Sequence, residues 1–148
     1  MEKYTIEFII QALNEAGWKP IRSIEPWLII PVESGAETYY LSLCIYENEK
    51  ILFVKGLVYG SIEEKQEKIL MEFIQTGNHR LPVSNFEYDL QNKELNCRSG
   101  IYLDNLKLTS QLIHNLVYEV YDNVKHYKPL VQAVFEKQKT LEDIFNGK

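Results

Sequence analysis

Clustered positive charge is missing from this sequence. Its 148 residues include 16 lysines and arginines against 21 aspartates and glutamates, which gives a formal net charge of −5. Proteins that bind nucleic acid gather lysine and arginine against the phosphates, because this releases counterions. Here the cations are scattered among acidic or neutral neighbours, as on solvated helix faces. We therefore expect no nucleic acid among the partners.

Long apolar runs are also missing. A helix that spans a bilayer needs about 20 consecutive apolar residues, whereas the apolar segment at residues 27–32 is short and contains Pro31. The first four residues open with an acidic side chain and lead into a helical pattern, unlike a secretory signal. We therefore expect no membrane association and a cytoplasmic location.

Cysteine is scarce. Cys44 and Cys97 are the two cysteines, and they fall in strand-like segments far apart in the sequence. A small buried hydrophobic side chain fits such positions better than a disulfide does, so we predict two free thiols. A nucleophilic role would need an activated thiolate, for which the sequence offers no sign.

Motifs for cofactors and metals are absent too. Asp122 and His126 would share a helix face, but a metal site usually needs three or four ligands and no others are suitably spaced. Gly56 and Gly60 lack the lysine and the third glycine that nucleotide-binding loops require. We therefore predict no catalytic, cofactor-binding or metal-binding residue, and no cofactor.

Hydrophobic periodicity and turn signals divide the chain into helices and strands. Ser61 and Glu64 form a capping box before the second helix, and Gly77-Asn78 gives a stop signal. Helices are predicted over residues 2–16, 61–76 and 109–127, and strands over residues 27–30, 38–46, 51–54, 85–90 and 95–101.

This order, α-β-β-β-α-β-β-α, predicts an α+β fold with an antiparallel five-stranded sheet and flanking helices. Pro129 should kink or interrupt the last helix, although apolar residues keep helical spacing beyond it. Residues 140–148 form a short amphipathic segment that could cover the core or a partner. We predict one domain over residues 1–148, in which residues 130–148 can serve as a docking extension.

Three segments of the chain read Leu81-Pro82-Val83-Ser84-Asn85-Phe86-Glu87-Tyr88-Asp89, Glu94-Leu95-Asn96-Cys97-Arg98-Ser99 and Tyr127-Lys128-Pro129-Leu130. They resemble the YbjN family of bacterial proteins, which has a type III secretion chaperone-like fold. The resemblance implies an antiparallel sheet flanked by helices, a tendency to dimerise and a non-enzymatic binding or regulatory role. True secretion chaperones are small, acidic and dimeric, and this chain departs from them in its long carboxy-terminal helical region.

Tyrosine is abundant, with 10 in the chain. Tyr40, Tyr46 and Tyr102 should project from strand faces opposite the main apolar stripe, and Arg98 shares the alternation of Tyr102. Aromatic side chains with a polar tip are enriched at protein interfaces, although tyrosine is also a normal cross-strand partner. The residues predicted to bind protein are Trp27, Tyr40, Tyr46, Arg98 and Tyr102.

Three functions remain open from the sequence. The first is a homodimeric protein-binding module, chaperone-like or regulatory, with a protein partner. The second is a small-ligand sensor or small enzyme whose pocket lies between sheet and helices. The third is an interaction subunit that pairs the strand at residues 27–30 with a partner strand at the sheet edge.

Overall fold

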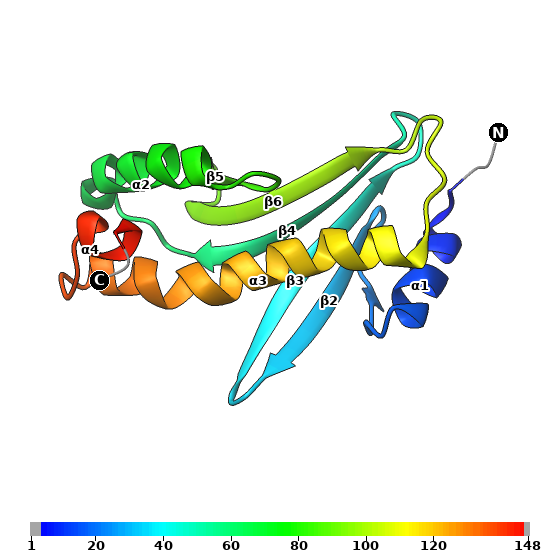
Figure 1. The fold of residues 1–148 in the computed structure, drawn as a ribbon, viewed down its shortest axis with the longest axis horizontal. Coiled ribbons are helices and arrows are strands. Elements are labelled where there is room, and N and C mark those ends of the chain that lie inside the picture. Colours follow the sequence, from blue (N-terminus) through cyan, green and yellow to red (C-terminus); the bar gives the residue numbers. More distant parts are fainter. Residues whose placement is uncertain (1–3, 147–148) are drawn as a thin grey trace.

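The structure, a computed structural model, describes residues 4–146 as a curved antiparallel sheet with helices along one face (Figure 1). The strands are β1 (Ile21–Arg22), β2 (Trp27–Ser34), β3 (Glu37–Tyr46), β4 (Ile51–Tyr59), β5 (Asn85–Asp89) and β6 (Glu94–Tyr102). The helices are α1 (Ile6–Glu15), α2 (Glu67–Arg80), α3 (Ser110–Phe135) and α4 (Leu141–Phe145), with a 3-10 turn, η1 (Glu64–Gln66), before α2. The predicted α+β class is confirmed.

The sheet has six strands, in the order β1-β2-β3-β4-β6-β5, so the prediction of five strands was wrong. The additional strand, β1, is only two residues long, and it pairs with Leu28 and Ile29 of β2. Two residues are too few to show the alternation by which a strand is recognised in a sequence. All neighbouring strands are antiparallel, as predicted.

The core lies between the sheet and the long helix α3. Alternate residues of the central strands point toward α3 and are fully buried, among them Leu41, Leu43, Leu52 and Val54. Gly56 lets β4 approach the helix closely, because a Cβ there would lie 2.7 Å from Val124 and 2.8 Å from Leu41. Burial of this apolar face is the main source of stability in such a fold.

Helix α3 continues through Pro129, so the interruption that the sequence suggested does not occur. Proline removes the hydrogen bond that its N–H would give to the carbonyl of Lys125, one turn earlier. Lys125 is exposed, so its carbonyl can bond to water instead. Beyond the proline, Val131 and Val134 are buried and hold the last turns of the helix to the protein.

Helix α2 differs from its prediction at both ends. Its capping box is formed one turn before it by Glu63 and Gln66, whereas Ser61 has a positive φ and does not cap the helix. The helix also continues past Gly77, because this glycine serves packing and not termination. A Cβ on Gly77 would lie 2.8 Å from the ring of Phe86 on β5.

Helix α1 closes the end of the core opposite α2. Thr5 caps its amino terminus, and Gly17 follows its end with φ of +94°, as the predicted left-handed cap requires. The hydroxyl of Tyr4 donates to the carbonyl of Leu106 and accepts from the N–H of Leu108, which ties the start of α1 to the loop before α3.

Candidate functional site

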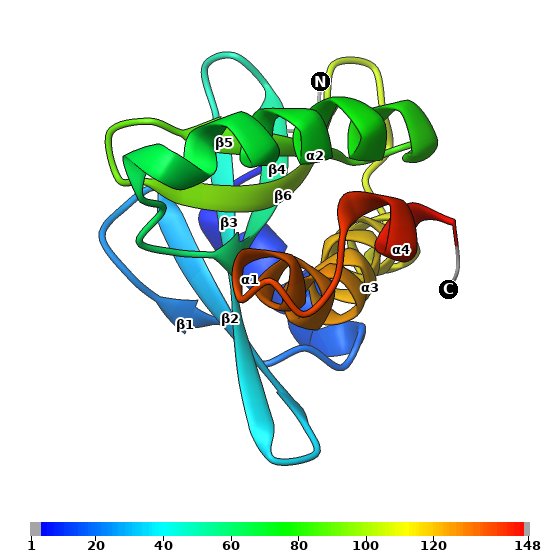
Figure 2. The same ribbon diagram turned by 90° about the vertical axis from the view of Figure 1, so that its left-hand side faces the viewer.

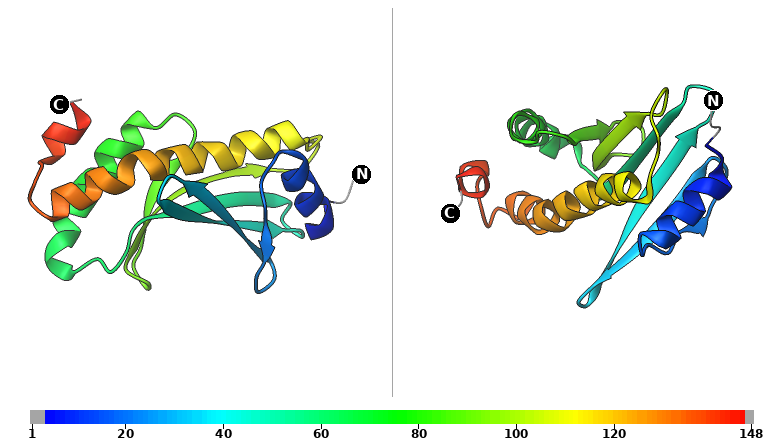
Figure 3. Two further views of the ribbon diagram at one scale, coloured as in Figure 1. Left: turned by 90° about the horizontal axis from the view of Figure 1, so that it is seen from below. Right: turned by 45° about the vertical axis from the view of Figure 1, so that its right-hand side comes forward.

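The sheet face turned away from α3, here called the outer face, carries all five residues predicted to bind protein. Figure 3 shows this face free of the described helices. Side chains alternate along each strand, and the register aligns them across strands, so Tyr46 and Tyr102 both pair with Ile51. The predicted residues on this face are Trp27, Tyr40, Tyr46, Arg98 and Tyr102.

The three tyrosines of the outer face are exposed to solvent. Tyr102 has 73% of its surface exposed, Tyr40 has 64% and Tyr46 has 41%, whereas Trp27 and Arg98 are half-buried. None of the three tyrosines therefore contributes greatly to the core. Three large aromatic side chains exposed to water on one face of the free protein are unusual.

An aromatic cluster on the outer face joins β2, β3 and β4. Phe53 is its hub, with its ring centroid 5.4 Å from Trp27 in an edge-to-face arrangement and 5.5 Å from Tyr46. Trp27 and Phe53 both pair with Cys44 in the strand register. Phe53 was missing from the predicted residues, because the run Ile51-Leu52-Phe53-Val54 is apolar throughout and does not show which side chains face the core.

Two cations stack on the aromatic cluster. The guanidinium of Arg98 lies 4.6 Å from the centroid of Phe53, and the ammonium of Lys55 lies 5.0 Å from that of Trp27. Arg98 also forms an ion pair with Glu87 on β5, with a nitrogen–oxygen distance of 3.2 Å. Lys55 too was absent from the predicted set. The outer face therefore offers aromatic rings with positive charge above them, inside an acidic protein.

Both cysteines are free and buried, as predicted. Burial raises the pKa of the Cys97 thiol, which lies under α3, to about 12. Burial also raises the pKa of Cys44, which lies beneath the aromatic cluster. A thiol attacks as its thiolate, so neither cysteine is activated for nucleophilic chemistry.

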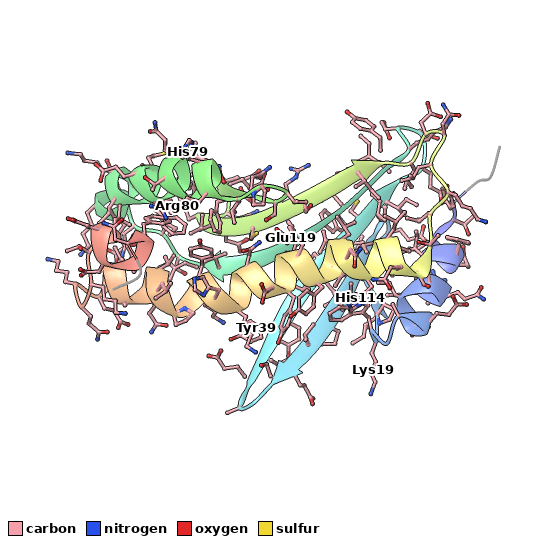
Figure 4. All side chains as sticks on the ribbon, in the orientation of Figure 1. Lys19, Tyr39, His79, Arg80, His114 and Glu119 are labelled. Atoms are coloured by element: carbon pink, nitrogen blue, oxygen red, sulfur yellow. The ribbon has the colours of Figure 1, made fainter. Side chains whose placement is uncertain are left out.

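The histidines do not converge on one site. Figure 4 shows His79 on α2 and His114 on α3, far apart along the molecule. His114 stacks on Trp18 at 5.5 Å, and His126 lies against Tyr127. Within residues 4–146, no three histidine, cysteine or acidic side chains are placed to hold a metal ion.

A polar network occupies the space between β5 and α3. Ser84 donates to Glu119 at 3.0 Å, and the amide of Asn123 donates to both of them, at 2.8 Å and 3.1 Å. Figure 4 places Glu119 on the middle of α3. Because these groups form hydrogen bonds with one another, we infer that the network holds the start of β5 against α3.

The sheet edge that the sequence suggested for strand pairing is largely covered. Leu28 and Ile29 pair with β1, and the N–H of Ser23 donates to the carbonyl of Trp27. The unpaired edge of β2 begins at Ile30 and includes Pro31, which has no N–H to offer.

Among the described helices, none is long and apolar enough to cross a bilayer.

Comparison with solved structures identifies the fold. YbjN from E. coli, described as a candidate transcription regulator, superposes with a TM-score of 0.69 at 8% sequence identity, over 93% of this chain and 96% of that one. The chain has a YbjN-like fold. A chain of the HopA1–SchA chaperone–effector complex superposes on this YbjN-like fold with a TM-score of 0.57 at 9% identity, covering 82% and 90% of the two chains.

A chain of the ExsC–ExsE complex also matches the YbjN-like fold, with a TM-score of 0.48 at 16% identity, covering 78% of this chain and 77% of that one. No protein-family model matches the sequence, and no curated protein does. The resemblance drawn from the sequence is therefore confirmed at the level of the fold, which is chaperone-like.

Proposed function

We propose that this protein is a non-enzymatic protein-binding module, chaperone-like or regulatory, which acts as a homodimer in the cytoplasm. Residues 1–148 would act as one domain. The observation that carries the proposal is the outer face, where three exposed tyrosines share one side of the sheet with an aromatic cluster on which Arg98 and Lys55 stack. Trp27, Tyr40, Tyr46, Arg98 and Tyr102 are the proposed contact residues.

The chemistry of the outer face suits a protein partner. Tryptophan, tyrosine and arginine are the residue types that contribute most binding energy at protein interfaces. The stacking of Arg98 on Phe53 and of Lys55 on Trp27 already restricts these side chains, so binding loses less conformational entropy. The partner surface that fits best is acidic and carries aliphatic or aromatic side chains, because the outer face presents cations over aromatic rings.

The fold supports the same proposal by analogy. One neighbour is a chaperone bound to its effector, so this architecture can hold a polypeptide. The net charge of −5 speaks against a nucleic acid as the partner. No cofactor, metal or membrane takes part in the proposed activity.

Capture from a lysate of the source organism tests the proposal. The tagged protein should retain a stoichiometric protein partner, and its native mass should be that of a dimer. A chain with Tyr40→Ala and Tyr102→Ala should lose the partner or the dimer while remaining folded, because both side chains are largely exposed. Tyr118→Ala is the matched control, since Tyr118 is 47% exposed but lies on α3.

If both variants captured the partner equally and had the same native mass, the outer face would have no part in the function. A small-ligand sensor or small enzyme is the alternative, and a thermal-shift screen with metabolites, nucleotides and metals separates the two. A ligand at one hundred times its dissociation constant stabilises the native state by about 2.7 kcal/mol, which such a screen detects.

A further inference from the structure

The groove between α2 and α3 is filled by the last helix of the described chain. Leu141, Ile144 and Phe145 occupy helix positions i, i+3 and i+4 of α4 and pack against the core. Figure 2 shows α4 below α2 and beside the carboxy-terminal end of α3. The groove therefore accepts the apolar face of an amphipathic helix, which is a common mode of peptide recognition.

Phe145 lies in an aromatic site to which three other elements contribute. Its ring stacks on Phe73 of α2 at 5.5 Å and lies 6.4 Å from Tyr127 of α3. Phe86 of β5 completes the cluster, 4.9 Å from Phe73. The guanidinium of Arg80 lies 5.3 Å from the centroid of Phe145. The site thus recognises an aromatic side chain by stacking and by a cation.

Helix α4 fills only part of this groove. Beside Leu141 a cavity of about 500 Å³ remains open to solvent, lined by Ile69 and Glu72 of α2, by Val134 of α3 and by residues 137–143. Ile69 and Phe73 are four residues apart on α2, so the cavity continues the groove that holds Phe145. Ile69 and Val134 stay in place when α4 leaves, so a helix longer than α4 would cover them and bury more apolar surface.

Helix α4 is weakly anchored for a core element. It has five residues, none of them fully buried, and residues 136–140 that connect it to α3 are exposed. Isolated helices shorter than about 12 residues are marginal in water, so α4 depends on its contacts with the groove. Local opening of such a terminal element costs much less than global unfolding.

We propose that the α2–α3 groove binds an amphipathic helix of a protein partner, and that α4 occupies the groove until this helix displaces it. The partner helix carries aliphatic residues at i and i+3 and an aromatic residue at i+4, like α4, and extends by at least one turn along Ile69 and Val134. Its first turn is acidic, as is that of α4, which carries Glu142 and Asp143. This surface is separate from the outer face and does not depend on its function.

A titration of the isotope-labelled full chain with a synthetic peptide of residues 137–148 tests the proposal by NMR. In the chain with Ile144→Ala and Phe145→Ala, the peptide should shift amide signals of α2 and α3. The wild-type chain should bind it at least about tenfold more weakly, because its own α4 competes for the groove. The dispersion of the spectrum reports whether each variant is folded.

Two further substitutions in the double variant locate the binding site. Ile69→Lys places a charge in the groove and should abolish binding. Met71→Lys, at an exposed position of the same helix, should leave binding unchanged. Hydrogen exchange of the wild type gives independent support if the amides of α4 exchange much faster than those of α3.

Several results would overturn the proposal. They are equal affinity of wild type and double variant, binding that survives Ile69→Lys, or α4 amides as protected as the centre of α3. A native mass that falls from dimer to monomer in the double variant would also overturn it, because α4 would then occupy the groove of a second copy.

Discussion

The side-chain amide of Asn78 pairs with both backbone groups of Phe86. The N–H of Phe86 donates to Oδ1 of Asn78, and Nδ2 of Asn78 donates to the carbonyl of Phe86 at 3.0 Å. β5 is the last strand of the sheet, so these groups would otherwise form an open edge. An asparagine of α2 thus takes the place of a further strand.

Replacement of Asn78 by alanine should lower the free energy of unfolding by about 1–3 kcal/mol, because two partly buried backbone groups lose their partner. Urea denaturation measures the change. Asn115→Ala is the control, since Asn115 is exposed and accepts a hydrogen bond from the nearby Gln111. It should change stability by less than about 0.5 kcal/mol. Equal effects of the two substitutions would contradict the role of Asn78.

The two glycines of the β4 region should respond differently to alanine. Gly56→Ala places a methyl group 2.7 Å from Val124 and 2.8 Å from Leu41, and should destabilise the fold by about 1–3 kcal/mol. At Gly60 the nearest side chain, Leu57, is 3.8 Å away, so Gly60→Ala should be neutral within about 0.5 kcal/mol. Thermal unfolding of the two variants compares them, and a neutral Gly56→Ala would mean that α3 does not press on β4.

Both thiols should react slowly with a thiol reagent in the native protein and quickly after denaturation. Burial raises the pKa of Cys97 to about 12, so at pH 9 this thiol should still lack the thiolate that an unfolded cysteine, with a pKa of about 8.5, would provide. Trp27→Ala should accelerate the labelling of Cys44, its cross-strand neighbour, and leave Cys97 unchanged. Acceleration of both thiols would instead indicate general unfolding.

Stability should fall in strongly alkaline solution. The hydrogen bond from Tyr39 to Glu37, followed by burial, raises the pKa of Tyr39 to about 12. The folded state therefore holds this proton more tightly than the unfolded state, whose tyrosine pKa is about 10. The resulting stabilisation is complete below pH 10 and is lost as the pH rises to about 12.

Urea denaturation at pH 9, 10, 11 and 12 measures this loss. Tyr39→Phe should reduce the decrease in stability above pH 10, because it removes the titrating hydroxyl while keeping the ring that packs on Tyr121. Tyr118→Phe, on the exposed side of α3, serves as the control and should leave the pH profile as it is in the wild type. An unaltered profile for Tyr39→Phe would rule out Tyr39 as the source.

The sequence predicted those parts of the fold that depend on periodicity within one segment. Alternation along β3 and β6 placed Tyr40, Tyr46, Arg98 and Tyr102 on one side of their strands, and the register confirms this arrangement. The face that these residues share with Phe53 depends on how β4 aligns with its neighbours. Such alignment is set by contacts between distant segments, which a single sequence does not display.

The differences from prediction have the same origin. Gly77 carries the signature of a helix stop, but its lack of a side chain is used for contact with Phe86, nine residues later. Pro129 is a helix breaker by its own chemistry, yet burial of Val131 and Val134 keeps the helix intact. In each case tertiary packing outweighed a local preference.

Pro31 restricts how copies of this protein can associate. It stands on the part of β2 that β1 leaves unpaired, so a strand added there would meet a residue without an N–H. Asn78 already occupies the other end of the sheet at Phe86. Growth by strand addition is therefore disfavoured at both ends, and copies that meet must do so through their faces. An interface in which two copies use the same face is complete in a dimer. We therefore expect closed oligomers of defined size at high concentration, and no fibres.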